Sequence, residues 1–294
     1  MKHKRYTIGV IGAGRVGAVL GAALSRAGHR VVAAVGVSAA SKTRAERLLP
    51  GVQLRPADEV AKAADLVLLA VPDDLLAGLV AGLVETGAIR AGQVVAHTSG
   101  AHGLAVLAPA TARGAHPLAI HPAMTFTGTE PDLDRLANGV SFGITATDQT
   151  KAIAQRLVRD LRGTAEWVAE ERRPLYHAAL AHGANHLVTL VNEAMDRLRD
   201  AGVEHPERVL APLLGAALDN TLRFGDAALT GPVSRGDAGT VAKHLAVLEA
   251  AAPESVPPYL ALARRTADRA IAARRLKAAD AVPLMDVLAG ERVA

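Results

Sequence analysis

The amino-acid sequence predicts a doubly wound α/β domain followed by an all-α domain. Three observations support this fold class: short apolar runs alternate with helical or turn segments up to Trp167, a glycine-rich turn joins the first strand to the first helix, and only helical patterns follow Pro174. At 294 residues the chain is near the size at which one domain becomes two. We therefore expect a first domain over residues 1–170 and a helical second domain over residues 171–294.

Short apolar and β-branched runs predict the strands of the first domain. Their alternation with helical or turn segments is typical of a mostly parallel sheet that is covered on both faces. Helices are expected over Arg15 to Ala27, where apolar residues recur at helical spacing, and over about Asp74 to Thr86. The predicted strands are Tyr6 to Ile11, Arg30 to Val37, Asp65 to Val71, Gln93 to His97, Ala115 to Ile120 and Val140 to Thr145.

The second domain is expected to contain helices only. Pro174 suits the first turn of a helix, and the helical pattern that it opens runs to about Asp200. Further helices are predicted over Glu207 to Arg223, Thr240 to Ala250 and Pro258 to Leu276.

Composition and charge exclude several classes of protein. The absence of cysteine rules out disulfides, thiolate metal sites and cysteine nucleophiles, and a net charge of +4 does not require a nucleic-acid partner. No apolar run is long enough to cross a bilayer as a helix of about 20 residues. The first 28 residues superficially resemble a signal peptide, with basic residues at Lys2 to Arg5, but a glycine motif explains the apolar run better. We therefore expect a cytoplasmic protein that binds neither membranes nor nucleic acid.

The glycine motif runs from Gly12 to Gly17 as Gly-Ala-Gly-Arg-Val-Gly, after a predicted strand and at the start of a helix. Gly12 allows a sharp turn, Gly14 lets the backbone approach a pyrophosphate, and Gly17 lets helix and strand pack closely. The free N–H groups of the helix start, at Arg15 and Val16, would bind phosphate. The motif predicts a Rossmann dinucleotide-binding site.

The segment that follows the second predicted strand, Val37 to Arg44, contains no carboxylate. A site that prefers NAD usually has Asp or Glu there to bind the ribose 2′-OH. Ser38, Ser41 and Arg44, together with Lys42, instead offer hydroxyl and cationic donors to a 2′-phosphate. The sequence thus favours NADP(H), and the alternative is that Lys42 and Arg44 only solvate the next helix.

Three turns follow strands at the predicted carboxyl edge of the sheet, where ligands bind in such folds. We expect the nicotinamide to lie along Val71, Pro72 and Ser99, and the substrate to contact Ser99, Gly100 and His121. His121 is the first candidate for acid catalysis because an ordinary histidine has a pKa near neutrality. A purely structural role for His121 is the alternative.

Further motifs are His97 to Gly100, His121-Pro122 with Phe126, Tyr176-His177 with Asn185-His186, and Ala228 to Asp237. With the glycine turn, they make essentially the whole chain resemble a family of reductases that join a Rossmann-like domain to a helical domain of uncharacterised function. More distantly, the chain resembles ketopantoate reductase, pyrroline-5-carboxylate reductase and prephenate dehydrogenase, with the architecture of 6-phosphogluconate dehydrogenase.

The resemblance implies a doubly wound, mostly parallel Rossmann sheet, an all-α second domain and a homodimer formed through that second domain. It also implies an NADPH-dependent oxidoreductase that acts on a small 2-oxo acid, with ketopantoate as the first candidate. The alternatives are a cyclic-imine reductase, a prephenate-type dehydrogenase, and a redox sensor that binds NADP(H) without turnover.

Ketopantoate reductases and hydroxyacid dehydrogenases carry Lys and, four residues later, Asn on one helix. Asn185 could match the Asn, but the residue four positions earlier is Ala181, so another proton donor is needed. His177 lies near the same helix face, and we take His121, His177 and Asn185 as candidate catalytic residues. Asn185 could instead tie helices together.

His182 and His186 lie one helical turn apart, a spacing that permits both to bind one metal ion. The sequence offers no persuasive third ligand, so no metal site is expected.

A polar, glycine-rich turn from Leu229 to Thr240 precedes a predicted helix, so that its N–H groups and Arg235 could hold a carboxylate. It resembles the substrate-side loop of pyrroline-5-carboxylate reductase, which implies that Thr230, Arg235 and Asp237 bind substrate. The alternative is that Asp237 caps the helix and pairs with Arg235.

Overall fold

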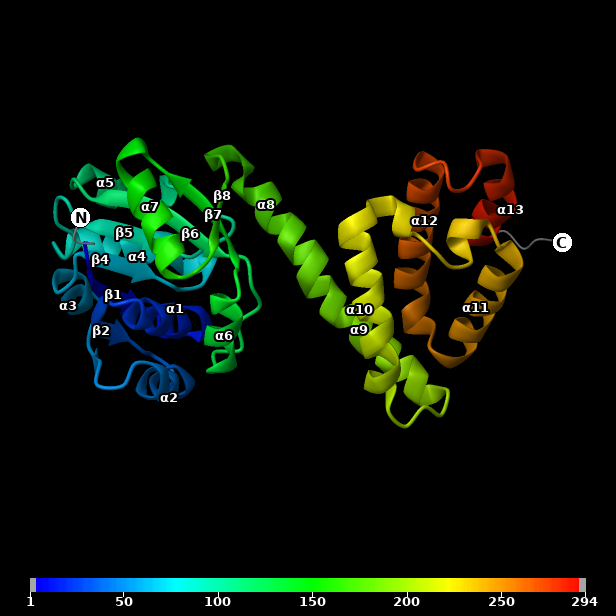
Figure 1. Cartoon of the computed structure of the whole chain (residues 1–294), viewed down its shortest axis with the longest axis horizontal. Coiled ribbons are helices and arrows are strands. Elements are labelled where there is room, and N and C mark those ends of the chain that lie inside the picture. The colour runs from blue at the N-terminus through cyan, green and yellow to red at the C-terminus, as the bar shows by residue number, and fades with distance from the viewer. Residues whose placement is uncertain (1–3, 291–294) are drawn as a thin grey trace. The chain divides into compact units, whose positions relative to one another are not determined.

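A computed structural model describes residues 4–290 of the chain, which divides into two compact units, residues 1–185 and 186–294 (Figure 1). Each unit is described by itself. Lys2 and His3, part of the signal-peptide-like segment, lie outside the described residues. None of the helices within residues 4–290 combines the length and apolar character needed to cross a membrane.

The first unit contains an eight-stranded sheet with the order β3-β2-β1-β4-β5-β6-β7-β8. All neighbouring strands are parallel except β6 and β7. This confirms the doubly wound, mostly parallel α/β fold. The strands are β1 (Thr7–Ile11), β2 (Arg30–Val35), β3 (Gln53–Leu54), β4 (Leu66–Leu69), β5 (Val94–His97), β6 (His116–Pro122), β7 (Ser141–Ala146) and β8 (Thr164–Trp167).

Both faces of the sheet are buried, as the uniformly apolar strands require. On β4, Leu66 and Leu68 belong to one apolar cluster, whereas Val67 and Leu69 belong to another on the opposite face. Helices α1, α6 and α7 contribute to the first cluster, and α3, α4 and α5 to the second. The helices are α1 (Arg15–Arg26), α2 (Ala39–Leu48), α3 (Ala57–Lys62), α4 (Asp73–Glu85), α5 (Ala108–Ala112), α6 (Pro131–Ala137), α7 (Asp148–Asp160) and α8 (Arg173–Leu180).

The direction of β7 differs from the parallel arrangement that the strand pattern predicted. It runs antiparallel to β6, with Ile144 opposite Ile120. An antiparallel neighbour needs no crossover helix along the sheet face, and the connecting segment holds only the short helix α6. The edge strands β3 and β8 were not predicted, because the first is two residues long and the second is largely exposed.

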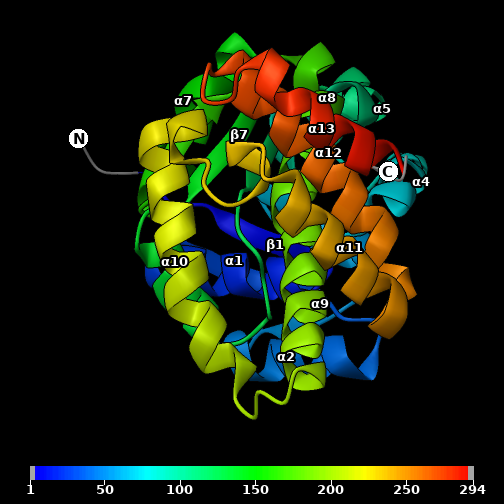
Figure 2. The same cartoon turned by 90° about the vertical axis from the view of Figure 1, so that its right-hand side faces the viewer.

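Within the described residues, the second unit is built from helices, which Figure 2 draws as coiled ribbons. Its apolar core is built mainly by α11, α12 and α13, around Val241, Ala267 and Leu284. By contrast, α9 has no fully buried residue, and α10 has only Pro206 and Leu210. The helices are α9 (His186–Asp200), α10 (Pro206–Phe224), α11 (Ala238–Ala251), α12 (Val256–Ala272) and α13 (Ala278–Ala289).

Two helical predictions need correction. The helix predicted from Pro174 to Asp200 is interrupted, because a π-helical turn over Ala181–Asn185 follows α8. The helix predicted over Pro258 to Leu276 ends at Ala272, since Arg274 adopts a left-handed conformation with φ of 58° and the chain then turns into α13. Helix α13 was not predicted, and it contains a proline, which normally interrupts helices.

Candidate active site

The glycine turn between β1 and α1 has the local geometry of a phosphate-binding loop. Gly12 has φ of 101°, and a Cβ there or at Gly17 would collide with the backbone of Ala70 or Gly12, respectively. A Cβ at Gly14 would meet nothing within 4 Å, so this side of the loop is open. Helix α1 begins at Arg15 without a side-chain cap and without an acidic residue in its first turn. Its N–H groups are therefore suited to an anion.

The turn after β2 is held by two serines. The Ser38 hydroxyl oxygen accepts from the Ser41 amide at 3.1 Å, and the Ser41 hydroxyl donates to the Ser38 carbonyl at 2.7 Å. The Ser41 hydroxyl is thus engaged within the turn, whereas Ser38 keeps a hydroxyl proton to donate. Lys42 is exposed, and the first turn of α2 has no acidic residue.

A cavity of about 380 Å³ lies at the carboxyl edge of the sheet. It is formed by the turns after β1, β4 and β5 and by the end of β6. The structure therefore brings five of the eleven predicted cofactor residues together with both candidate histidines. The lining residues are Arg15, Val16, Ala70, Val71, Pro72, Asp73, Thr98, Ser99, Gly100, His121 and His177.

A smaller cavity of about 210 Å³ shares His121 and His177 with the first and includes Asn185. The three predicted catalytic residues thus line connected surfaces of the first unit. Gly100 explains how the two histidines come so close to the turn after β5. A Cβ at Gly100 would lie 2.7 Å from His177 Cδ2 and 3.1 Å from His121 Nε2.

His121 pairs with Tyr176 of α8. Its Nδ1 lies 2.9 Å from the Tyr176 hydroxyl, and the two rings meet edge to face with centroids 5.6 Å apart. Burial, with smaller contributions from Arg173 and His177, lowers the pKa of His121 to about 4. This value lies well below the near-neutral pKa that is expected of an ordinary histidine. At pH 7 His121 is a neutral imidazole with one N–H to donate.

Arg173, the first residue of α8, was not among the predicted site residues. Its side chain is fully buried, and its guanidinium donates to the carbonyls of Ser99 at 2.6 Å, His102 at 2.8 Å and Gly143 at 3.0 Å. Within residues 4–290 no ion pair forms to it, and burial lowers its pKa. The guanidinium carbon lies 5.7 Å from the centre of the Tyr176 ring. Its position three residues before Tyr176 was the one signal in the sequence.

His97 and Ser99 shape the turn after β5. His97 is fully buried, with Nε2 2.7 Å from the Gly103 carbonyl and Nδ1 accepting from the Ser99 amide at 3.2 Å. Burial lowers the pKa of His97 to about 4. The Ser99 hydroxyl oxygen accepts from the amides of Ala101 and His102, so this predicted contact residue also holds the turn.

The predicted substrate residues Thr230, Arg235 and Asp237 lie in the second unit. Asp237 caps α11, because its carboxylate accepts from the Thr240 amide at 3.0 Å and from the Thr240 hydroxyl at 2.7 Å. This is the capping role named as the alternative. Among the three, Thr230 alone lines a cavity of about 440 Å³ in this unit.

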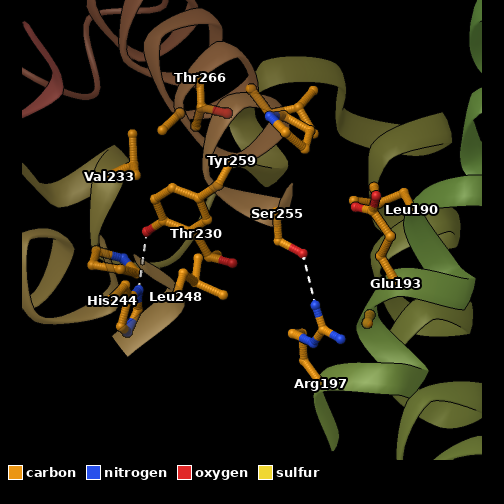
Figure 3. Close-up of a pocket in the computed structure, with 15 residues that line it drawn as sticks. Leu190, Glu193, Arg197, Thr230, Val233, His244, Leu248, Ser255, Tyr259 and Thr266 are labelled. Atoms are coloured by element: carbon orange, nitrogen blue, oxygen red, sulfur yellow. Dashed lines mark hydrogen bonds between the residues drawn. The ribbon is translucent and has the colours of Figure 1, made fainter. Parts of the chain in front are cut away.

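Figure 3 shows that cavity, which is lined mainly by apolar side chains of α9, α11 and α12. A second His–Tyr pair lies on its wall, with His244 Nδ1 3.0 Å from the Tyr259 hydroxyl. Arg197 donates to the Ser255 hydroxyl at 3.0 Å and pairs with Glu254. Among the residues that the structure describes, no group of three His, Asp or Glu side chains is arranged to hold a metal ion.

Comparisons with known proteins agree with this two-part architecture. Residues 1–122 match a Rossmann-like domain, and residues 140–266 match a domain of unknown function, DUF2520. No curated protein sequence matches the chain.

Three solved structures illustrate the shared fold. A candidate NADP oxidoreductase from Bacteroides fragilis has 24% identity and a TM-score of 0.77, over 90% of this chain and 98% of that chain. A protein from Thermotoga maritima has 18% identity and a TM-score of 0.65, over 91% and 100%. Pyrroline carboxylate reductase from Plasmodium falciparum, with NADP bound, has 12% identity and a TM-score of 0.56, over 90% and 98%. The chain therefore joins a Rossmann-like domain to a DUF2520 domain, which is the combination that its motifs predicted.

Proposed function

We propose that this protein is an NADPH-dependent oxidoreductase that reduces a C=O or C=N bond of a small molecule. One observation carries the proposal: a single cavity connects the glycine turn at Arg15 and Val16 with His121 and His177. The open side of Gly14 and the uncapped start of α1 fit a pyrophosphate. NADPH, when bound, supplies the hydride. The fold shared with NADP-binding reductases supports the choice by analogy.

The preference for NADP over NAD rests on the end of β2. This segment has no carboxylate, which would repel a 2′-phosphate. Ser38, Lys42 and Arg44 can instead donate hydrogen bonds to the 2′-phosphate. We expect NADPH to bind more tightly than NADH in a fluorescence titration, and Arg44→Gln to weaken NADPH binding about 10-fold while leaving NADH binding unchanged. Equal or tighter binding of NADH by the unmodified protein would refute the preference.

The first substrates to test are small 2-oxo acids, with ketopantoate as the leading candidate. Reduction of a ketone requires a proton at the carbonyl oxygen as well as a hydride. The neutral N–H of His121, at the edge of the cavity, is the candidate donor.

A cyclic imine is the second candidate, and the low pKa of His121 favours it. A protonated imine already carries its proton, so it can accept a hydride without an acid in the site. Loss of NADPH absorbance should be measured with 2-oxo acids and with cyclic imines, and loss of NADP⁺ with prephenate-like acids. Cofactor binding without turnover on the whole panel would instead favour a redox sensor.

The second unit is proposed to form a homodimer. Helix α10 exposes Leu213, Leu218, Leu222 and Phe224, and α9 exposes Val188. Apolar patches of this extent on a soluble protein usually mark an interaction surface. Light scattering of the full chain should give twice the chain mass, and the double variant Leu218→Glu with Leu222→Glu should give the mass of one chain. A monomeric unmodified protein at micromolar concentration would refute the dimer.

A further inference from the structure

Helix α8 presents Arg173, Tyr176 and His177 on one face, at positions i, i+3 and i+4. The Tyr176 hydroxyl reaches His121 Nδ1 at 2.9 Å, and the opposite ring nitrogen, Nε2, is the one that approaches Gly100 in the cavity. The imidazole of His121 therefore lies between a phenol on one side and the cavity on the other.

We propose that Tyr176 and His121 form a proton relay and that Arg173 is its positioning residue. The relay rests on the proposed function, since it serves the reduction of a carbonyl. As the hydride forms a C–H bond at the carbonyl carbon, the π electrons move to oxygen, and His121 Nε2–H protonates that oxygen. Tyr176 gives its hydroxyl proton to Nδ1, which leaves a phenolate and a neutral imidazole. Nδ1–H then returns its proton to the phenolate while a solvent acid protonates Nε2, which restores the phenol and the Nε2–H imidazole. Each turnover thus consumes one hydride from NADPH and one proton from solvent.

The buried charge of Arg173 offsets part of the cost of forming a phenolate at Tyr176. Three backbone carbonyls from two separate segments fix the guanidinium, and no carboxylate within residues 4–290 pairs with it. A fixed cation near the Tyr176 ring favours the phenolate over the phenol. Burial raises the pKa of Tyr176, and Arg173 opposes this shift. The protein thus supplies the charge that the relay needs without placing it in the cavity.

The same surroundings keep His121 neutral, which the relay requires. Arg173 and His177 on α8, and to a smaller extent His97 on β5, disfavour a positive charge on His121. Asp73 at the start of α4 favours that charge. Burial is the largest contribution, and the net result is a lowered pKa. His121 can therefore donate from Nε2 and accept at Nδ1 in one step, as a neutral imidazole does.

The first test does not depend on turnover. In the full chain, long-range ¹H–¹⁵N NMR, assigned with a His121→Gln variant, should show His121 protonated at Nε2 and unprotonated at Nδ1 between pH 6 and 8. A proton on Nδ1, donated to the Tyr176 oxygen, would overturn the relay. This outcome would leave the proposed reductase activity untouched.

The second test measures the proton transfer itself. Tyr176→Phe is expected to lower kcat about 10- to 100-fold with unchanged NADPH affinity, and to convert a curved proton inventory in H₂O–D₂O mixtures into a linear one. Tyr259→Phe makes the same chemical change in the second His–Tyr pair (Figure 3) and should leave kcat and the inventory unchanged. A change in kcat below about 2-fold in Tyr176→Phe would overturn the relay.

Arg173→Lys keeps a positive charge and should retain a larger share of kcat than Arg173→Met. If Arg173→Met fails to fold, the kcat and proton inventory of Tyr176→Phe still test the relay. Absence of turnover by the unmodified protein on every substrate would overturn the proposed function instead.

Discussion

Among the described residues, two His–Tyr pairs are joined by a hydrogen bond between the phenol and the imidazole, and they have nearly the same local geometry and different surroundings. In the first pair, His121 Nδ1 lies 2.9 Å from the Tyr176 hydroxyl oxygen, and the two ring planes make an angle of 89°. In the second pair, His244 Nδ1 lies 3.0 Å from the Tyr259 hydroxyl oxygen, and the ring planes make an angle of 85°. Burial alone raises the pKa of Tyr259, whereas at Tyr176 the Arg173 cation opposes burial. The first pair also lies at the carboxyl edge of a parallel sheet. The proposed relay therefore depends on the charge and the sheet edge around the first pair, and not on the geometry of the pair itself.

Removing each histidine tests this comparison most strongly. His121→Ala should lower kcat about 10³-fold, or about 4 kcal/mol of transition-state stabilisation, because it removes the proposed proton donor to the substrate. His244→Ala should leave kcat unchanged. Steady-state kinetics on the first active substrate would measure both, with NADPH affinity as the control. Equal losses in the two variants would break the distinction between the pairs.

Removing the buried cation should produce the next largest effect. Arg173→Met removes the donor from three backbone carbonyls, two of them buried and one part-buried, at about 1 kcal/mol or more each, so we expect a loss of about 3–4 kcal/mol. Trp167, the single tryptophan, lies on β8 and reports urea unfolding of the first unit.

Arg264 of α12 is the matched control in the second unit. It donates from Nε and Nη2 to one carbonyl, that of Leu288. Arg264→Met should therefore cost only about 1 kcal/mol, measured by far-ultraviolet circular dichroism in urea. If the two variants lose equal stability, the first unit does not depend on Arg173 in the way that its three carbonyl contacts indicate.

The same contrast explains what the sequence could and could not predict. Strand ends were predictable because an apolar run followed by a polar turn is a local pattern, and parallel strands bring their carboxyl ends to one edge. Val71, Gly100 and His121 were placed in one crevice on this basis, and the structure puts all three on one cavity.

Arg173 could not be predicted in this way, because arginine in a polar segment normally indicates a solvated surface. Its partners are backbone carbonyls of Ser99, His102 and Gly143, which any residue type could supply. Nothing in their identity points to a cation. The direction of β7 and the edge strand β8 were missed for a related reason, since they depend on tertiary pairing and not on a local apolar pattern.

Acid acting on His97 should lower the unfolding free energy of the first unit by less than Arg173→Met does and by more than the loss of one hydrogen bond. The folded pKa of His97 is about 4, and its ordinary value is 6.5. Between these values the unfolded chain binds a proton that the folded chain does not, so stability is full above pH 6.5 and falls as the pH drops towards 4. The loss is about 3 kcal/mol at most for His97. Urea unfolding at several pH values, followed by Trp167 fluorescence, should show this slope. His97→Gln should reduce the slope by about half, because His121, whose pKa is also lowered to about 4, contributes the same dependence. An unchanged slope in His97→Gln would assign the acid sensitivity to other groups.

The smallest expected effect is the loss of unfolding free energy when the tyrosine hydroxyl is removed from either His–Tyr pair. Tyr176→Phe and Tyr259→Phe each remove one hydrogen bond between a phenol and an imidazole, so each should cost about 1 kcal/mol of unfolding free energy. Urea unfolding of the two variants should therefore give similar losses, while their kcat values differ. A loss above about 3 kcal/mol in Tyr176→Phe alone would mean that its kinetic defect reflects a disturbed α8. Equal stability costs with unequal turnover would show that the two hydrogen bonds are alike and that Arg173 and the sheet edge make one of them chemically useful.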